Sequence, residues 1–260
     1  FKLGTFKDGK VVMDKDKYAN KQLRQALLYA IDREEWVKEF FSGLGNPVNR
    51  PMPSAHWIAA DNSELPVNYT YDPEKAKQLL DEAGYKDVDG DGFREDPNGK
   101  KFEINFAHYD TGNPTYEARA KAITQYWEEV GIKSNLTMTE VNLYYDQIEK
   151  DHETMEAFYG GWGTGADPDP WALWGDDTDW NYPRWVNEEA NELLKQAVDV
   201  EVVGTDQEKR KNLYVEWQKI FNEEVPALPI MELNDVYAIS NKVQGVKITP
   251  VGTEDMHKWS

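Results

Sequence analysis

The chain has 260 residues, of which 48 are acidic and 29 basic, so its formal net charge is -19. This length can bury one good core, or a large lobe with a small appendage, but it is too short for two full domains. The negative charge disfavours nucleic acid and anionic lipid surfaces as partners, and the absence of cysteine excludes disulfides, thiol nucleophiles and cysteine metal ligands.

The beginning of the chain resembles that of a processed protein. It starts at Phe1 without an initiator methionine or a signal peptide, as a mature product or an excised fragment would. The lack of cysteine fits an exported bacterial protein. No run of about 18 apolar residues occurs, so no segment is predicted to span a bilayer.

Three helices are expected in the first third of the chain. Apolar residues at helical spacing predict a helix over 18–30, and Asp32 with Glu35 forms a capping-box pattern for a second helix ending near Gly43. A third helix is expected over 73–83, because an aspartate and a proline open it and a glycine follows it.

A strand, a helix and another strand come next. The apolar patterns predict a strand over 102–106, a helix from Pro114 to Gly131 and a strand over 132–141. A parallel crossover of this kind is right-handed. The fold is therefore expected to belong to the α/β class, with helices packed against a sheet.

The second half continues this pattern more loosely. A short helix is expected over 143–150, a strand over 157–162 and a helix over 188–200. Thr205 with Glu208 forms a further capping-box pattern, which opens a long amphipathic helix.

The last part of the chain is expected to be mostly extended. Two prolines in the apolar run 225–231 favour an edge strand or an extended crossover, because proline cannot donate to a central ladder. Residues 233–260 contain only short β-like pieces, at 236–239 and 246–248, with no obvious partner strand.

Carboxylates alternate in the segment 87–95, Asp-Val-Asp-Gly-Asp-Gly-Phe-Arg-Glu. Alternate acids on a tight loop bring their oxygens together, as a hard cation such as Ca²⁺ requires. A true EF-hand is not expected, because Asn98 replaces the glutamate of position 12. The segment is either a weak or partial Ca²⁺ site or an acidic turn between a helix and a strand. The ligands would be Asp87, Asp89, Asp91, Phe93 through its carbonyl, and Glu95.

The segment 159–171, Tyr-Gly-Gly-Trp-Gly-Thr-Gly-Ala-Asp-Pro-Asp-Pro-Trp, is the most informative stretch. Its glycines let the backbone approach a ligand, its indoles offer flat contact area, and its acids can pair with an amine or a cation. We favour ligand capture over the alternative of a plain connecting loop. The candidate ligand-binding residues are Tyr159, Gly161, Trp162, Gly163, Thr164, Asp167, Asp169 and Trp171.

The tryptophans divide into two groups. Trp127 and Trp217 lie on predicted apolar faces and are expected in the core. Five others cluster in a loop-rich region and are candidate ligand contacts: Trp162, Trp171, Trp174, Trp180 and Trp185. The histidines lack metal-binding spacing, and no P-loop or nucleophile elbow occurs, so motifs for a catalytic zinc, for nucleotides and for hydrolases are missing.

Four blocks of sequence carry a family resemblance. They are Leu-Arg-Gln-Ala-Leu-Leu-Tyr-Ala-Ile-Asp-Arg-Glu at 23–34, the helix opened by Pro73 with the acidic loop after it, the Trp-to-Ile block at 127–132, and the Trp162 loop with its Asp-Pro pair. In this order they resemble the extracellular solute-binding proteins of the peptide/nickel class, the receptors of oligopeptide ABC importers.

The resemblance implies a type II periplasmic-binding-protein-like C-terminal lobe with a mixed sheet flanked by helices. Residues 1–232 would form this ligand-binding lobe, and residues 233–260 would return across a hinge to an N-terminal lobe that the chain lacks. The implied partners are an extended oligopeptide and an ABC permease in the membrane. The implied location is the cell surface, as a Gram-positive lipoprotein, or the periplasm, and no cofactor is required.

One feature departs from the family pattern. Several peptide-binding relatives carry an aspartate shortly after the tryptophan that pairs with the amine of the peptide, whereas Gly165 and Ala166 stand at the nearest positions here. Asp167 could substitute if the loop is shifted by one residue.

The sequence favours a binding protein without enzymatic activity. The alternative is a carbohydrate-active enzyme or sugar-binding module that uses the Trp/Asp-rich loop, with Asp167, Asp169, Asp176 and Asp177 beside the tryptophans. Glycosidase action needs two carboxyl groups at a defined separation, one of them with a raised pKa, whereas peptide capture needs exposed backbone groups at a strand edge. A purely structural interaction domain is a third interpretation, which the glycine-tryptophan loop disfavours.

Overall fold

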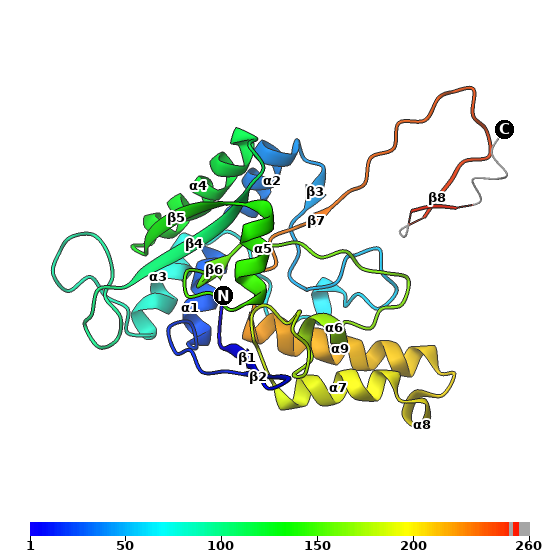
Figure 1. The fold of residues 1–260 in the computed structure, drawn as a ribbon, viewed down its shortest axis with the longest axis horizontal. Coiled ribbons are helices and arrows are strands. Elements are labelled where there is room, and N and C mark those ends of the chain that lie inside the picture. Colours follow the sequence, from blue (N-terminus) through cyan, green and yellow to red (C-terminus); the bar gives the residue numbers. More distant parts are fainter. Residues whose placement is uncertain (250–251, 255–260) are drawn as a thin grey trace.

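The computed structural model describes residues 1–249 and 252–254 of the chain. A three-stranded parallel sheet in the order β5-β4-β6 is surrounded by helices (Figure 1). The register pairs Phe106 of the central strand with Leu136 on one side and with Ala157 on the other. The strands of this sheet are β4 (Glu103–Asp110), β5 (Lys133–Glu140) and β6 (Ala157–Phe158).

The two faces of the sheet are covered by different helices. Successive side chains of a strand point to opposite faces, so Phe106 meets Trp127 of α4 (Pro114–Glu129) in the main core, at a ring distance of 5.4 Å. Ala107 packs on the other side against Tyr144 of α5 (Val141–Glu149). The α/β class and the parallel strand-helix-strand unit are confirmed.

The N-terminal helices begin at side chains that cap them. Asn20, Asp32 and Asp72 each accept hydrogen bonds from backbone amides at the start of a helix, where those amides have no partner within the helix. Because Asn20 is the cap, the first helix starts later than the predicted residue 18. These helices are α1 (Lys21–Tyr29), α2 (Arg33–Phe41) and α3 (Pro73–Glu82).

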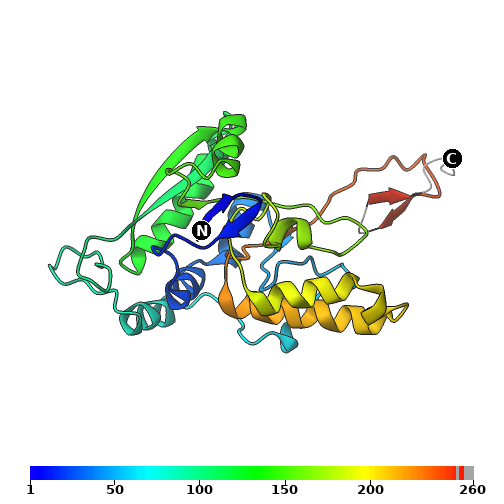
Figure 2. The same cartoon turned by 60° about the horizontal axis from the view of Figure 1, so that its bottom comes forward.

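The helices α7 and α9 lie side by side below the sheet in Figures 1 and 2. The cap of α9 is Asp206, which accepts from the amide of Lys209, so the prediction that Thr205 caps this helix is wrong. The predicted helix over 188–200 is split near Asp199, which ends one helix and caps a short one. The helices of this half are α6 (Trp171–Trp174), α7 (Glu188–Val198), α8 (Val200–Val203) and α9 (Gln207–Glu224).

Short antiparallel pairs and one 3-10 turn complete the described structure. The pairs join β1 to β2, β3 to β7 and β8 to β9. Their bounds are Thr5–Lys7 for β1, Lys10–Val12 for β2, Gly45–Asn46 for β3, Glu232–Leu233 for β7, Lys247–Thr249 for β8 and Gly252–Glu254 for β9, and the turn η1 covers Asn62–Glu64. The fold is therefore mixed in strand direction, although its main sheet is parallel.

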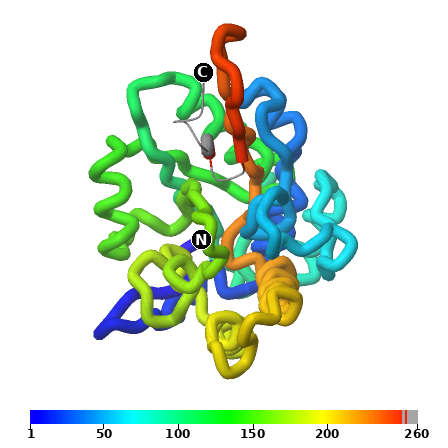
Figure 3. Tube along the Cα trace, turned by 90° about the vertical axis from the view of Figure 1, so that its right-hand side faces the viewer, coloured from blue at the N-terminus to red at the C-terminus, as the bar shows by residue number. Residues whose placement is uncertain are grey.

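After β7 the chain leaves the helices and the main sheet as an extended segment, which Figure 1 shows at the right and Figure 3 shows rising above the yellow and orange helices. The β-like piece at 236–239 pairs with no other strand of the described chain, in line with the expectation that it has no partner here. The piece at 246–248 does find a partner, since β8 pairs with β9. In the described part of the chain, no helix combines the length and the apolar character needed to cross a membrane.

Candidate functional site

The glycine- and tryptophan-rich loop leaves the sheet at the carboxyl ends of β4 and β6 (Figure 1). The amide of Tyr159 donates to the carbonyl of Ala107 at 3.2 Å, and the Tyr159 carbonyl accepts from the hydroxyl of Tyr144 at 2.6 Å. The strand ends at Phe158, so the predicted strand over 157–162 is too long. In open α/β sheets, ligands bind outside the carboxyl ends of the strands, which is where this loop begins.

A buried arginine lies beneath the start of the loop. Arg119 of α4 is 6% exposed, and it donates from Nε to His108 Nε2 at 3.2 Å and from Nη2 to the Tyr109 hydroxyl at 2.8 Å. Its guanidinium lies over the rings of Tyr116 at 4.0 Å and Tyr159 at 5.0 Å. Within residues 1–249 and 252–254 no carboxylate pairs with Arg119, so contacts with aromatic rings take the place of a salt bridge.

His108 is held in one neutral form by this arrangement. Because its Nε2 accepts from Arg119, we assign the ring proton to Nδ1, which donates to the Tyr109 carbonyl at 2.8 Å. Burial, reinforced by the charge of Arg119, lowers the pKa of His108 to about 4. The ring stacks on Tyr159 at 4.8 Å and so supports the first residue of the loop.

Sequence reasoning missed Arg119 and His108 as parts of the site. A signal was present, because Arg119 stands beside Ala120 on the buried side of a predicted helix, and His108 continues the inward alternation of Phe106. Charged or titratable side chains on an apolar face require a partner. The cluster of aromatic rings around them supplies it.

Two indoles are exposed on the loop side of the lobe. Trp162 is 45% exposed and Trp180 is 52% exposed, and their rings stack at 6.5 Å with an interplanar angle of 25°. Tyr182 supports them from within, with its ring 5.0 Å from that of Trp162. Aromatic faces that remain exposed although they are already aligned are suited to stacking on a further group.

The glycines of the loop are not required by the backbone conformation. Gly160, Gly161 and Gly163 all have negative φ angles, and a Cβ atom added to any of them would meet no atom within 4 Å. Thr164 follows them and is exposed. Side chains are thus absent where the fold leaves room for them, which exposes backbone N–H and C=O groups at this surface.

The acidic residues of the loop already have partners within the lobe. Asp167 pairs with Arg210 of α9 at 3.2 Å and accepts the amide of Asp169 at 3.0 Å. Asp169 in turn accepts the amide of Trp171, and the Trp171 indole donates to Asp177 at 2.9 Å. These bonds attach the outer half of the loop to α6 and α9.

The five clustered tryptophans do not share one environment. Trp162 and Trp180 are exposed and Trp171 is half-buried. The prediction that Trp174 and Trp185 contact ligand is wrong, because they are 6% and 2% exposed in the main core. Trp127 and Trp217 lie in the core as predicted.

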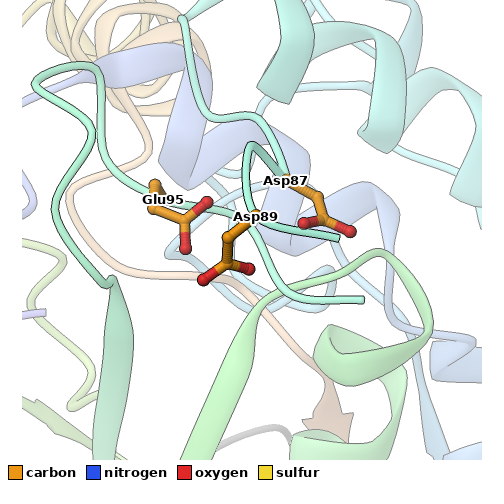
Figure 4. A group of neighbouring side chains, drawn as sticks. All are labelled: Asp87, Asp89 and Glu95. Carbon is orange, nitrogen blue, oxygen red and sulfur yellow. The ribbon is translucent and has the colours of Figure 1, made fainter. Parts of the chain in front are cut away.

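The acidic loop 87–95 forms a separate cluster at the opposite end of the lobe, at the left in Figure 1. Oxygens of Asp87, Asp89 and Glu95 lie within 4.8 Å of one another, and Figure 4 shows these three side chains on neighbouring stretches of the loop. Asp91 is not one of these three residues, and its carboxylate contacts the ammonium of Lys101 at 2.5 Å, as Asp89 also does. Phe93, expected to offer its carbonyl, donates its amide to Asp91 at 2.9 Å.

Residues 7–198 match the family model of the "Bacterial extracellular solute-binding proteins, family 5 Middle". The chain belongs to this family. The family 5 relationship confirms the resemblance drawn from the four sequence blocks and agrees with the α/β fold. The proteins of this family are described as bacterial, extracellular and solute-binding.

Individual relatives cover nearly the whole chain. Heme-binding protein A of Haemophilus influenzae is 31% identical over 246 residues, which are 92% of this chain and 41% of the relative. Oligopeptide-binding protein AppA of Bacillus subtilis is 28% identical over 249 residues, 93% of this chain and 44% of the relative.

A solved structure agrees with these sequence matches. The structure of AppA from Bacillus subtilis in complex with a nonapeptide has a TM-score of 0.79 and 25% identity, and the match covers 96% of this chain and 49% of that one. The chain therefore spans less than half of the length of these relatives.

Proposed function

We propose that this chain is one lobe of a receptor that captures extended oligopeptides for an ABC importer. The observation that carries the proposal is the surface at the carboxyl ends of β4 and β6. There the exposed indoles of Trp162 and Trp180 adjoin a stretch of glycine backbone with open space above it. An extended peptide is recognised through its main chain, and an open backbone edge beside aromatic contact area suits it.

Each part of this surface would have a distinct role. The backbone of Gly161 and Gly163 would exchange hydrogen bonds with the peptide, because no side chain blocks its approach. Trp162 would stack on the peptide, and Tyr159 would fix the direction in which the loop leaves the sheet. Asp167 would pair with an amine of the peptide in competition with Arg210, which it contacts here at 3.2 Å.

The carbohydrate-active alternative is less well supported. The relatives are named as binding proteins, and a glycosidase would need two acids free to act on a sugar. Asp167 and Asp169 instead hold the loop through Arg210 and the amide of Trp171, and Asp177 accepts the Trp171 indole. We therefore propose a function without catalysis and without a required cofactor.

The rest of the receptor would supply the second wall of the binding cleft. Coverage of less than half of the relatives supports a two-lobed protein, in which residues 1–232 form this lobe. The tail 233–260 would return across the hinge, and apolar side chains in its described part support this, since Leu233 and Val236 are 59% and 68% exposed. The receptor would deliver peptide to a membrane permease from the cell surface, as a lipoprotein, or from the periplasm.

The test is a calorimetric titration of a nonapeptide into the two-lobed receptor and into this chain alone. The isolated lobe should bind at least about 100-fold more weakly, because one wall leaves half of the peptide backbone in water and domain closure is lost. Equal affinities would contradict the two-lobed arrangement. Hemin should be titrated in parallel, and binding of hemin without binding of peptide would overturn the ligand class.

A matched pair of variants locates the site on the receptor. Trp162→Ala should weaken peptide binding, whereas Tyr71→Ala, which removes another exposed aromatic ring beside Tyr126, should not. An equal loss in both variants would point to a general effect of aromatic truncation and not to this loop.

A further inference from the structure

We propose that the exposed pair Trp162 and Trp180 is the floor of a subsite for a cationic side chain of the bound peptide, preferably that of arginine. The subsite also includes Tyr182 and the carboxylates of Glu149 and Asp179. The proposal rests on the peptide-binding function proposed above and adds a side-chain preference to it. It is carried by two exposed indoles, by the contacts that hold them and by the charges beside them.

The two indoles come from separate segments and meet on one surface. Trp162 and Trp180 are 45% and 52% exposed, and their rings stack at 6.5 Å with an interplanar angle of 25°. The other tryptophans of the described chain are buried or half-buried. Large aromatic faces usually stabilise a fold by being buried, so two exposed indoles at one place are informative. Their faces are available to a partner.

Buried polar contacts hold the turn that carries Trp180. Thr178 Oγ1 accepts the amide of Trp180 at 3.2 Å. The side chain of Asn181 is buried and binds three backbone groups, since it donates to two carbonyls and accepts one amide. The ring of Tyr182 lies 5.0 Å from that of Trp162 and supports the pair from within. The indoles are therefore in position before a ligand arrives, which reduces the entropy lost on binding.

Two carboxylates lie beside this aromatic group. Glu149 Oε1 accepts from the Tyr182 hydroxyl at 3.0 Å, and Asp179 directly precedes Trp180 in the chain. Burial, the hydrogen bond to Glu149 and the charges of Glu149 and Asp179 raise the pKa of Tyr182, as expected if both charges are near its hydroxyl. Both acids are exposed, and within residues 1–249 and 252–254 neither forms a salt bridge.

Arg184 holds the segments that carry these two acids together. It is 0% exposed and donates from Nη1 to the backbone carbonyl of Asp179 at 2.6 Å and from Nη2 to that of Glu149 at 3.1 Å. Its Nε pairs with Asp151 at 2.8 Å, and the ammonium of Lys2 contacts the same carboxylate at 2.6 Å. Both of these cations are buried. The charges that this region exposes to a ligand are therefore those of the acids.

A cationic side chain fits this arrangement better than a neutral ring does. The face of an indole attracts an ammonium or guanidinium group within about 6 Å of its centre. A guanidinium is also planar, so it stacks on an indole while its N–H groups donate to a carboxylate. The net charge of -19 adds a general attraction for cations. Arginine is therefore preferred to lysine, and a neutral aromatic ring gains from stacking alone.

The experiment moves a single arginine through a neutral nonapeptide of alanine and serine, and each peptide is titrated into the two-lobed receptor by calorimetry. The reference at each position is the same peptide with citrulline, which keeps the shape of arginine without its charge. At one or two positions the arginine peptide should bind about tenfold more tightly than the citrulline peptide. The lysine peptide should lie between them, and the preference should weaken at high salt.

Variants of the receptor locate this preference. The readout is the ratio of the arginine affinity to the citrulline affinity, because a general effect on folding changes both affinities together. Trp180→Ala should reduce the ratio to below about threefold, whereas Trp180→Phe should keep most of it, since a phenyl ring also attracts a cation. Asp179→Asn should reduce the ratio about twofold to threefold. Glu201→Gln removes the same charge from an exposed position on α8 and should leave the ratio unchanged.

The outcomes separate the subsite from the function on which it rests. If arginine and citrulline peptides bind equally at every position, the receptor binds peptides but the subsite is wrong. A gain from arginine that is equal at all positions, or that Trp180→Ala leaves intact, reflects the charge of the whole protein and also overturns the subsite. A phenylalanine peptide that binds more tightly than the arginine peptide would overturn the cation in favour of a neutral ring. If none of the peptides binds, the proposed function falls, and the subsite with it.

Discussion

His108 should make the stability of the lobe depend on pH between neutrality and pH 5. Its ring is 0% exposed, and burial together with the charge of Arg119 lowers its pKa to about 4 in the folded lobe. In the unfolded chain the ordinary pKa of histidine is about 6.5. Between these values the unfolded chain binds the extra proton, so the free energy of unfolding falls as the pH is lowered through this range.

The size of the effect follows from the two pKa values. Protonation of His108 alone should reduce the free energy of unfolding by about 2 kcal/mol between pH 7 and pH 5, and by about 3 kcal/mol below pH 4. No negative charge among the described residues contacts the ring to offset this loss, because its partners are Arg119, the Tyr109 carbonyl and aromatic rings.

Urea unfolding at pH 7 and at pH 5, followed by tryptophan fluorescence, measures this dependence. Between pH 7 and pH 5, the free energy of unfolding of the wild type should fall by about 2 kcal/mol more than that of His108→Gln. The titration of all other groups is common to both proteins and cancels in this comparison. His152→Gln is the matched control, because His152 is exposed, and it should keep the pH dependence of the wild type. If His108→Gln and the wild type lose the same free energy, the account of a neutral, buried His108 is wrong.

Three further predictions test the binding role proposed for the loop 159–171 in a two-lobed receptor. Trp162→Ala should lower peptide affinity about 30-fold, the equivalent of about 2 kcal/mol, with little change in Tm. Calorimetry and thermal unfolding check both, and a lower Tm without a loss of affinity would mean that Trp162 stabilises the fold and does not contact the peptide. Gly163→Ala should leave stability unchanged or raise it by less than about 1 kcal/mol, because its φ is negative and no atom lies near the added Cβ, yet it should weaken peptide binding. Unchanged affinity in Gly163→Ala would show that no ligand approaches this backbone. Asp167→Asn should weaken peptides with a free N-terminus more than acetylated ones, and an equal effect on both would exclude amine recognition by Asp167.

Local chemistry made the beginnings of several elements predictable. Asp32 and Asp72 were recognisable as helix caps because the side chain and the amides that it binds are only a few residues apart. The prediction of Thr205 as the cap of the long helix is wrong, because the neighbouring aspartate is an equally good capping residue type. The structure selects Asp206 because its side chain reaches the amide of Lys209.

Features that depend on contacts between distant segments were not predictable in the same way. The strand at 157–162 ends at Phe158 because β4 pairs with it only through Phe106 and Ala107, which is a property of register and not of local sequence. The tryptophans Trp174 and Trp185 are buried because Phe221, far along the chain on α9, packs against both. Nothing within the loop-rich stretch distinguishes them from the exposed indoles.

The glycines of the loop support the proposed binding role, because the fold alone does not require all of them. Gly84 and Gly131 end helices with φ angles of +88° and +84°, conformations in which a side chain is strained, so the backbone itself requires them. Gly161 and Gly163 have negative φ and open space around the missing Cβ, and glycine there costs conformational entropy without a structural return. The proposed peptide, which would have to come close to the backbone beside the exposed ring of Trp162, would account for this residue type that the fold does not need.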